Sequence, residues 1–301
     1  MADERIYGRR ARVVISKPVA TPGDYTHVTT DQLELNASDD PKDPGNRMAF
    51  KCTKTGGKEP NTAELTITNL SGASRALIQE KGGKVLIEAG YRTTGTSRIF
   101  LGDIRSVDHV RSKADWETKI KLGDGERSYR HARLSESFAA GVTAADVLRR
   151  LAEATGLELG NVPAQAQSAA LTSLRFGNGY AVSGRVFDSL DRLIRSIGWS
   201  LAVHDGQLQV LAPGETYGPE IPLISPATGL IGSPEMGSPE KKGKPALLKF
   251  RCLLRPLTVG GRVHLQSLRY DGEVVIKKLE HSGDTHSGEW YSDAHGVIHG
   301  G

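Results

Sequence analysis

The sequence predicts an α+β protein that is mainly β, in which two β-rich regions flank a small module of helices and a hairpin. Three observations lead to this fold class. Apolar and polar residues alternate in segments of strand length between residues 59 and 126. Two segments between residues 143 and 198 instead repeat their apolar residues with the helical period. Strand-like segments return after a stretch rich in Pro and Gly.

The first β-rich region contains five or six expected strands and one short helix. Residues 62–70 alternate strictly, as a strand with one buried and one wet face does. Ser71 is the expected N-cap of a short crossover helix. Gly102 interrupts the alternation, which predicts a bulge that lets the sheet curl. Strands are expected at residues 11–16, 48–53, 62–70, 83–91, 99–107 and 116–122, and residues 17–46 are left without an assignment.

The middle of the chain predicts a compact α+β module. A helix is expected over 143–156, starting at a Thr143/Asp146 pair that resembles a capping box and stopping at a Gly. A second helix is expected over 184–198. Asp205-Gly206 then predicts a two-residue turn in a hairpin over 199–211.

Residues 213–245 hold 7 of the 14 prolines and predict an arm with little regular structure. Leu230 and Ile231 lie in this arm, and a solvated tether would gain nothing from them, so we expect them to contact a partner. The nearby Lys241 and Lys242 belong either to a solvated loop or to a contact with an acidic partner. A strand at 246–254 and a second hairpin, with its turn at Asp271-Gly272, form the closing β-rich region.

Composition excludes several functional classes. The net charge of +4 arises within residues 1–130, where 22 basic residues are interleaved with 18 acidic ones. A dedicated nucleic-acid binder would concentrate its basic residues, so tight binding is not expected. No apolar run can span a bilayer and the N-terminus lacks the core of a secretory signal, so we expect no membrane anchor. Cys52 and Cys252 are expected to stay reduced.

The C-terminal histidines are the most plausible candidates for chemistry. His281, Asp284 and His286 could supply ligands to zinc, but their spacing matches no compact zinc signature. A strand–loop–strand connection, with Trp290 and Tyr291 packing on the sheet, explains the segment better.

Hydrolase and phosphate-binding motifs are also weak. No Gly-x-Ser-x-Gly nucleophile elbow occurs. Gly123-Asp-Gly-Glu lacks the Lys and Ser/Thr of a P-loop and predicts a turn after a strand, with Asp124 and Glu126 as rim residues. We therefore expect no catalytic residue, no metal and no cofactor.

Taken in order, several of these segments resemble the baseplate hub proteins of tailed phages and contractile injection systems. The match runs over more than 200 residues, and each segment alone is weak. The matching segments are residues 57–70, 99–104, 123–126 with Arg127 and Tyr129, 184–211, 225–235 and 283–290.

The resemblance implies two tube-type antiparallel β-barrel domains in each chain of a homotrimer. Such a ring continues the hexameric tail tube, seats a threefold spike or central fibre, contacts other baseplate proteins and lets DNA pass without holding it. It implies a virion protein that assembles in the host cytoplasm. The domains are then expected at 1–128 for the first barrel, 129–212 for the α+β module, 213–245 for the arm and 246–301 for a second barrel that borrows strands from elsewhere.

Two other functions stay open at this point. A tail-associated cell-wall hydrolase would need an acid or a nucleophile in a cleft. A distal tail protein that docks receptor-binding fibres would form a hexamer. If the chain forms the trimeric ring, its inward strand faces should be polar and not predominantly basic, because strong phosphate binding would stall DNA passage.

Overall fold

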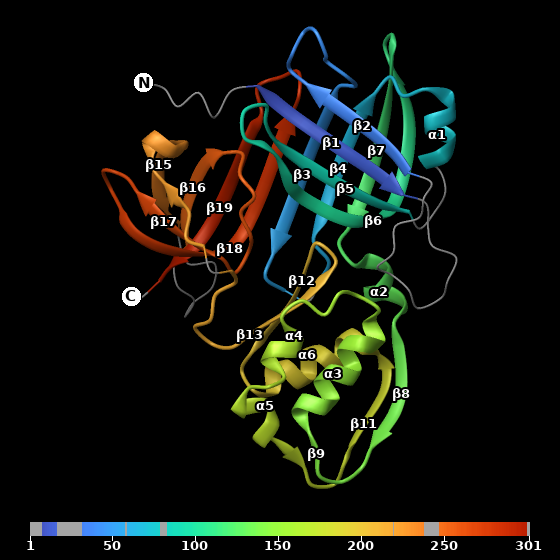
Figure 1. The fold of residues 1–301 in the computed structure, drawn as a ribbon, viewed down its shortest axis with the longest axis vertical. Coiled ribbons are helices and arrows are strands. Elements are labelled where there is room, and N and C mark those ends of the chain that lie inside the picture. The colour runs from blue at the N-terminus through green and yellow to red at the C-terminus, as the bar shows by residue number, and fades with distance from the viewer. Residues whose placement is uncertain are drawn as a thin grey trace.

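The structure is a computed structural model, and it describes residues 8–16, 32–57, 59–78, 83–218, 220–237 and 247–299. Strands dominate, as the sequence predicted, and a large antiparallel sheet lies above a smaller helical module (Figure 1). The first β-rich region consists of β1 (Arg9–Ser16), β2 (Gln32–Ser38), β3 (Met48–Thr55), β4 (Thr62–Thr68), α1 (Gly72–Ile78), β5 (Lys84–Tyr91), β6 (Gly95–Ser112) and β7 (Asp115–Gly123).

The first region curls around its own core. Alternate residues of β3, β4, β5 and β7 point inward, and Leu65 and Ile67 of β4 are completely buried there. β6 does carry a bulge, but not at the predicted Gly102, which pairs in regular register with Val85. The pairing of β6 with β7 shifts register further along, between Ile104 and Ser106. Ser71 caps α1 by accepting a hydrogen bond from the backbone N–H of Ser74 at 3.0 Å. β2 was not predicted and lies within the segment left unassigned.

The middle module has a second, separate core. It contains α2 (Glu126–His131), β8 (Arg133–Phe138), β9 (Val142–Thr143), α3 (Ala144–Thr155), α4 (Val162–Gln165), α5 (Ala169–Ser173), β10 (Arg175–Phe176), β11 (Tyr180–Arg185), α6 (Val186–Ser196), β12 (Ser200–His204) and β13 (Gln207–Leu211). α3 packs on α6, and the β12–β13 hairpin is contacted by α6 and α4, so that all of them share one apolar core. Thr143 caps α3, and Asp205 and Gly206 form the hairpin turn with positive φ angles of 53° and 81°, both as predicted.

The last β-rich region builds a third core. It comprises β14 (Leu223–Ile224), a 3₁₀ turn (Pro226–Thr228), β15 (Leu230–Met236), β16 (Leu248–Leu253), β17 (Arg262–Gln266), β18 (Asp271–Asp284) and β19 (Trp290–Ile298). β14 and β15 lie in the expected arm, so its described part is more regular than its Pro and Gly content suggested. Leu230 and Pro234 of β15 and alternate residues of β16 still pack inward, and this burial outweighs the composition.

The prediction of a second hairpin turn at Asp271-Gly272 is wrong. β17 and β18 are connected through residues 267–270, and Asp271 and Gly272 already pair with Gln266 and Leu265. Ser267 closes the actual turn, because its hydroxyl accepts hydrogen bonds from the backbone N–H groups of Arg269 and Tyr270.

One sheet of 13 strands runs through both β-rich regions. Its hydrogen-bonded path is β15-β16-β19-β18-β3-β4-β7-β6-β5-β1-β2, and β14 and β17 lie off this path. The regions meet where the second half of β18 pairs antiparallel with β3, from Lys278 opposite Thr55 to Asp284 opposite Ala49. Trp290 of the last region packs edge-on against Phe50 of the first, at 5.6 Å between ring centroids, as expected for a residue that packs back on the sheet. The division of the chain at residues 128, 212 and 245 stays a prediction.

Leu65 gives a direct test of the first core. Leu65→Ala should lower the free energy of unfolding by about 2–5 kcal/mol, because it removes a fully buried side chain from a central strand. Leu268→Ala, at a fully exposed turn, should change it by less than about 0.5 kcal/mol. Urea denaturation measures both, and equal effects would contradict this packing.

Candidate functional site

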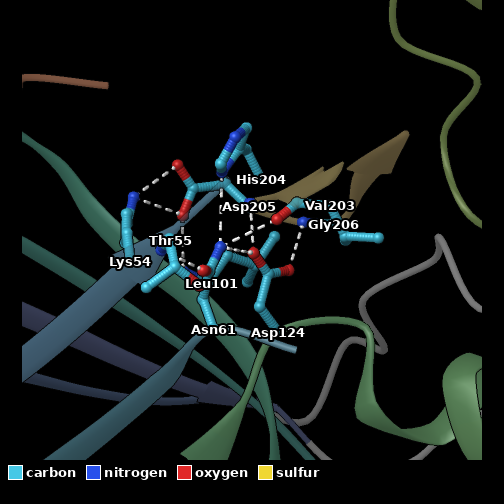
Figure 2. A network of polar contacts seen from close by, with 9 residues as sticks. All are labelled: Lys54, Thr55, Asn61, Leu101, Asp124, Val203, His204, Asp205 and Gly206. Atoms are coloured by element: carbon cyan, nitrogen blue, oxygen red, sulfur yellow. Dashed lines mark hydrogen bonds and ion pairs between the residues drawn. The ribbon is translucent and has the colours of Figure 1, made fainter. Parts of the chain in front are cut away.

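The β12–β13 turn of the module inserts into a polar junction at one end of the first β-rich region (Figure 2). Asp124, at the end of β7, accepts hydrogen bonds from the backbone N–H groups of Asp205 at 2.7 Å and Gly206 at 2.8 Å. A turn with positive φ angles points such N–H groups outward, and burial without a partner would be costly. The Asp124 carboxylate therefore fixes the module to the sheet.

Asn61 completes the same junction from the residue before β4. Its side-chain amide donates to the backbone carbonyl of Val203 at 2.8 Å and to Asp124 at 3.3 Å. Its side-chain oxygen accepts from the backbone N–H of Thr55 at 2.8 Å. One asparagine thus connects β3, β7 and the hairpin, and it is itself buried.

Lys54 supplies the charge at this junction. Its ammonium group contacts both carboxylate oxygens of Asp205 at 3.0 Å, and only 2% of its side chain is exposed. Asp205 also accepts a hydrogen bond from the backbone N–H of Leu101 at 3.1 Å. Removing either partner of such a pair leaves a poorly solvated charge, so the pair fixes the position of the turn strongly.

Burial controls ionisation in the junction. Burial, and secondarily the charge of Asp205, raise the pKa of Asp124 to about 7, against the opposing effect of its hydrogen bonds. Burial also lowers the pKa of His204 to about 4, so this imidazole is neutral at pH 7. Asp124 and Glu126 had been predicted as rim residues, and this prediction is wrong. Both are buried, because Asp124 holds the turn and Glu126 pairs with Arg105 and Arg130.

Sequence reasoning missed Lys54 and Asn61 altogether. Lys54 lies near the end of β3, one residue beyond the strand that the sequence predicted, and a lysine at the end of a strand is usually solvated. Asp124 did carry a signal in the sequence, because it lies between Gly123 and Gly125. The left-handed φ of 61° at Gly125 lets the chain turn directly into α2.

The C-terminal histidine segment does not form a reactive site. His281 is fully buried and its Nδ1 lies 2.8 Å from the hydroxyl of Ser292, which is equally inaccessible. Burial raises the pKa of Asp284, but hydrogen bonds from Arg47 and its neighbours bring it down to about 2. In the described part of the chain no three His, Cys, Asp or Glu residues are placed to hold a metal ion.

A second extended feature is the solvent-facing side of β16, β19, β18, β3, β4, β7 and β6, which we call the polar face. The strand registers place its charged residues on one side of the sheet. Lys51 and Glu280 form an ion pair of 2.8 Å across the β3–β18 pairing. The charged residues of this face include the basic residues Lys51, Lys119, Lys121, Lys249, Arg251 and Lys278, and the acidic residues Glu64, Asp108, Glu117, Glu280 and Asp293. The face is therefore charged but nearly neutral.

The four residues expected to contact a partner fall in different environments. Leu230 is 8% exposed and packs in the third core of its own chain. Ile231 is 41% exposed beside a groove of about 700 Å³ on the polar face. Lys241 and Lys242 lie outside the described residues. The contact itself stays a prediction.

The whole chain has the fold of phage tail proteins. It resembles the tail protein from Neisseria meningitidis MC58, with a TM-score of 0.60 and 11% identity over 96% of both chains. It also resembles the 43 kDa tail protein of prophage MuSo2 from Shewanella oneidensis, with a TM-score of 0.61 and 9% identity over 96% of this chain and 98% of that one.

A third structure widens the class. The E. coli c3393 protein, described as a component of the type VI secretion system similar to T4 tail proteins gp27 and gp5, matches with a TM-score of 0.52 and 10% identity over 84% of this chain and 73% of that one. No curated protein sequence matches significantly. These likenesses show the fold, and within that fold the polar groups described above join the module to the sheet.

The family follows from the sequence match. The model of the family described as Baseplate hub gp41 matches residues 41–296, so this chain belongs to that family of structural phage baseplate proteins. The resemblance seen in the sequence is thereby confirmed. No helix in the described residues is long and apolar enough to cross a membrane.

Asp124→Asn tests the junction. An Asn has one acceptor oxygen, so one turn N–H loses its partner and the free energy of unfolding should fall by about 1–3 kcal/mol. The raised pKa of Asp124 means that its stabilising contribution is largest at pH near 4 and declines as pH rises toward 7. The cost of the substitution should therefore be larger at pH 5 than at pH 8 in urea titrations. A cost that grows with pH would show that the hydrogen bonds dominate over burial.

Proposed function

We propose that this chain is a structural baseplate hub that assembles as a homotrimeric ring. The ring continues the hexameric tail tube on one side and seats a threefold spike or central fibre on the other, and its lumen passes DNA. Tail tube, spike and other baseplate proteins are its partners in the virion. Family membership supports the hub role.

The observation that carries the ring is a repeat of strand order within one chain. In the first region five strands follow the order β3-β4-β7-β6-β5, and in the last region five strands follow the order β15-β16-β19-β18-β17. Every neighbouring pair in both sets is antiparallel. Each chain therefore offers two similar units side by side, and three chains offer six, the number that a hexameric tube requires.

The polar face supports a lumen that DNA can traverse. A continuous sheet surface with interleaved lysines and carboxylates has no strong net attraction for phosphate, unlike a surface of lysine and arginine alone. Pairs such as Arg251 with Asp293, at 2.7 Å, neutralise basic groups locally.

The two alternatives fit the geometry less well. The His281–Ser292 pair is sealed from water, and Asp284 is ionised and paired with Arg47, so neither suits cell-wall hydrolysis. A distal tail protein would be a hexamer of chains, whereas a chain with two similar units needs three copies to make a sixfold ring.

Oligomeric mass separates these functions. The purified protein should have the mass of a trimer in native mass spectrometry, and end-on images should show a closed ring with a central opening. A hexamer of chains would favour the distal tail protein. A lone monomer at every concentration would rule out the ring.

Glu64→Lys tests whether the polar face lines the lumen. The substitution places a third lysine beside Lys51 and Lys121, so the assembled ring should bind duplex DNA with higher affinity and a steeper salt dependence. Glu153→Lys, on the exposed side of α3, is the matched control with the same charge change. Equal DNA binding by the two variants in a fluorescence anisotropy titration would contradict this assignment of the lumen wall.

A further inference from the structure

The internal repeat extends to the registers and to individual side chains. The long strand of each hairpin carries a bulge at the same place, between Ile104 and Ser106 in β6 and between Ile276 and Lys278 in β18. Five residues beyond the first residue of each bulge stands a histidine, His109 or His281. Both histidines bond a hydroxyl on the partner strand through Nδ1, to Thr118 at 3.0 Å and to Ser292 at 2.8 Å. β6 is thus the counterpart of β18, and by the same pairings β15 is the counterpart of β3.

Within one chain the two repeats are joined by β18 and β3. The first half of β18 pairs with β17, and its second half, from Lys278 to Asp284, leaves β17 and pairs with β3. At this joint His281 lies opposite Cys52, and both side chains are fully buried.

The counterpart strands have free edges. β6 pairs with β5 only as far as Asp103, and from Ser106 to Ser112 its sole strand partner among the described residues is β7. Within the described ranges β15 is the terminal strand of the sheet and pairs with β16 alone. β6 and β15, whose edges are unpaired among the described residues, are therefore the counterparts of β18 and β3, which pair with each other within the chain.

Both free edges carry exposed apolar side chains. Val110 of β6 is 44% exposed, and Met236 of β15 is 59% exposed. The counterpart of Met236 is Cys52, which the internal joint buries completely. His109 is half-buried and its Nε2 is shielded from solvent without a hydrogen-bond partner, whereas His281 is fully covered. The side chains on the free edges are therefore exposed as those of the β18–β3 joint would be if one of its two strands were absent.

We infer that β6 of one copy pairs antiparallel with β15 of the next copy, repeating between chains the β18–β3 pairing found within each chain. This inference rests on the ring in the proposed function and names the strands that close it. If β6 and β15 pair in the register of β18 and β3, Asp108 lies opposite Gly237, His109 opposite Met236 and Val110 opposite Glu235. Beyond the register shift in β15, Ser112 lies opposite Ile231.

The arrangement of the two edges suits a closed ring. β15 and the β6–β7 hairpin lie on opposite sides of the molecule in Figure 1, so the contact is head to tail and each copy uses both edges. Pro234 and the register shift in β15 remove one donor and interrupt the regular ladder, so the joint between copies has fewer hydrogen bonds than the joint within a chain. The same features keep β15 from pairing with an arbitrary strand.

Disulfide trapping tests the joint and its register. Residues directly opposite in an antiparallel pair have Cα atoms about 4.5–5.5 Å apart, within reach of a disulfide. Val110→Cys/Glu235→Cys should therefore give a covalent trimer under mild oxidation, seen on a non-reducing gel. Cys52 and Cys252 are buried and do not interfere. Asp108→Cys/Glu235→Cys is the matched control, because its diagonal pair lies about 7–8 Å apart and should not be trapped.

Each outcome bears on a different claim. A trimer by mass that never cross-links through residues 110 and 235 overturns the joint and leaves the ring of the proposed function intact. Equal cross-linking of the control overturns the register. A wild-type monomer at all concentrations overturns the ring, and the joint with it.

Charge repulsion provides a second measurement. Val110→Glu sets a carboxylate against Glu235 of the next copy and should weaken trimer association at least tenfold in analytical ultracentrifugation. Leu268→Glu makes the same kind of change at an exposed turn outside both edges and should leave association unchanged. The reverse pattern would place the contact elsewhere.

Discussion

The pairing of β18 with β3 is the constraint on which the rest of the structure depends. It connects strands that are more than 200 residues apart in sequence and turns two curled sheets into one. Backbone hydrogen bonds hold it, the buried His281 and Cys52 fill it from inside, and the Lys51–Glu280 ion pair spans it outside. Without it the chain would lack the hydrogen-bonded ladder between its two β units and would have no continuous sheet surface.

The module is fixed to this sheet by a different kind of contact. Here the hairpin contributes two backbone N–H groups, one backbone carbonyl and one carboxylate, and they bind Asp124, Asn61 and Lys54 of the sheet region. A polar junction of this type adds little net stability compared with an apolar contact, but it accepts only one position of the turn. In the ring proposed above, which would align six units with a tube, a fixed position matters more than a large binding energy.

The sequence was most informative where structure is local. The alternation of apolar and polar residues predicted β4, β5 and β7, the Thr143/Asp146 pair predicted α3, and Asp205-Gly206 predicted the module hairpin. Each of these signals lies within a few residues of the element that it specifies. The same kind of signal failed at Asp271-Gly272, where Ser267 forms the turn instead. It also failed at β2, whose partner β1 lies across an insertion. The order of segments was enough to recognise the hub family.

The sequence by itself determined a mainly β chain with an inserted helical module and no motif for catalysis. The tertiary structure decided which strands join the two β regions, that Asp124 and Lys54 are buried, and that one sheet surface carries balanced charge. Strand pairing between distant segments depends on matching backbone edges, and backbone edges look alike in every sequence. Burial of a charged residue depends on what folds over it, so neighbours along the chain do not report it.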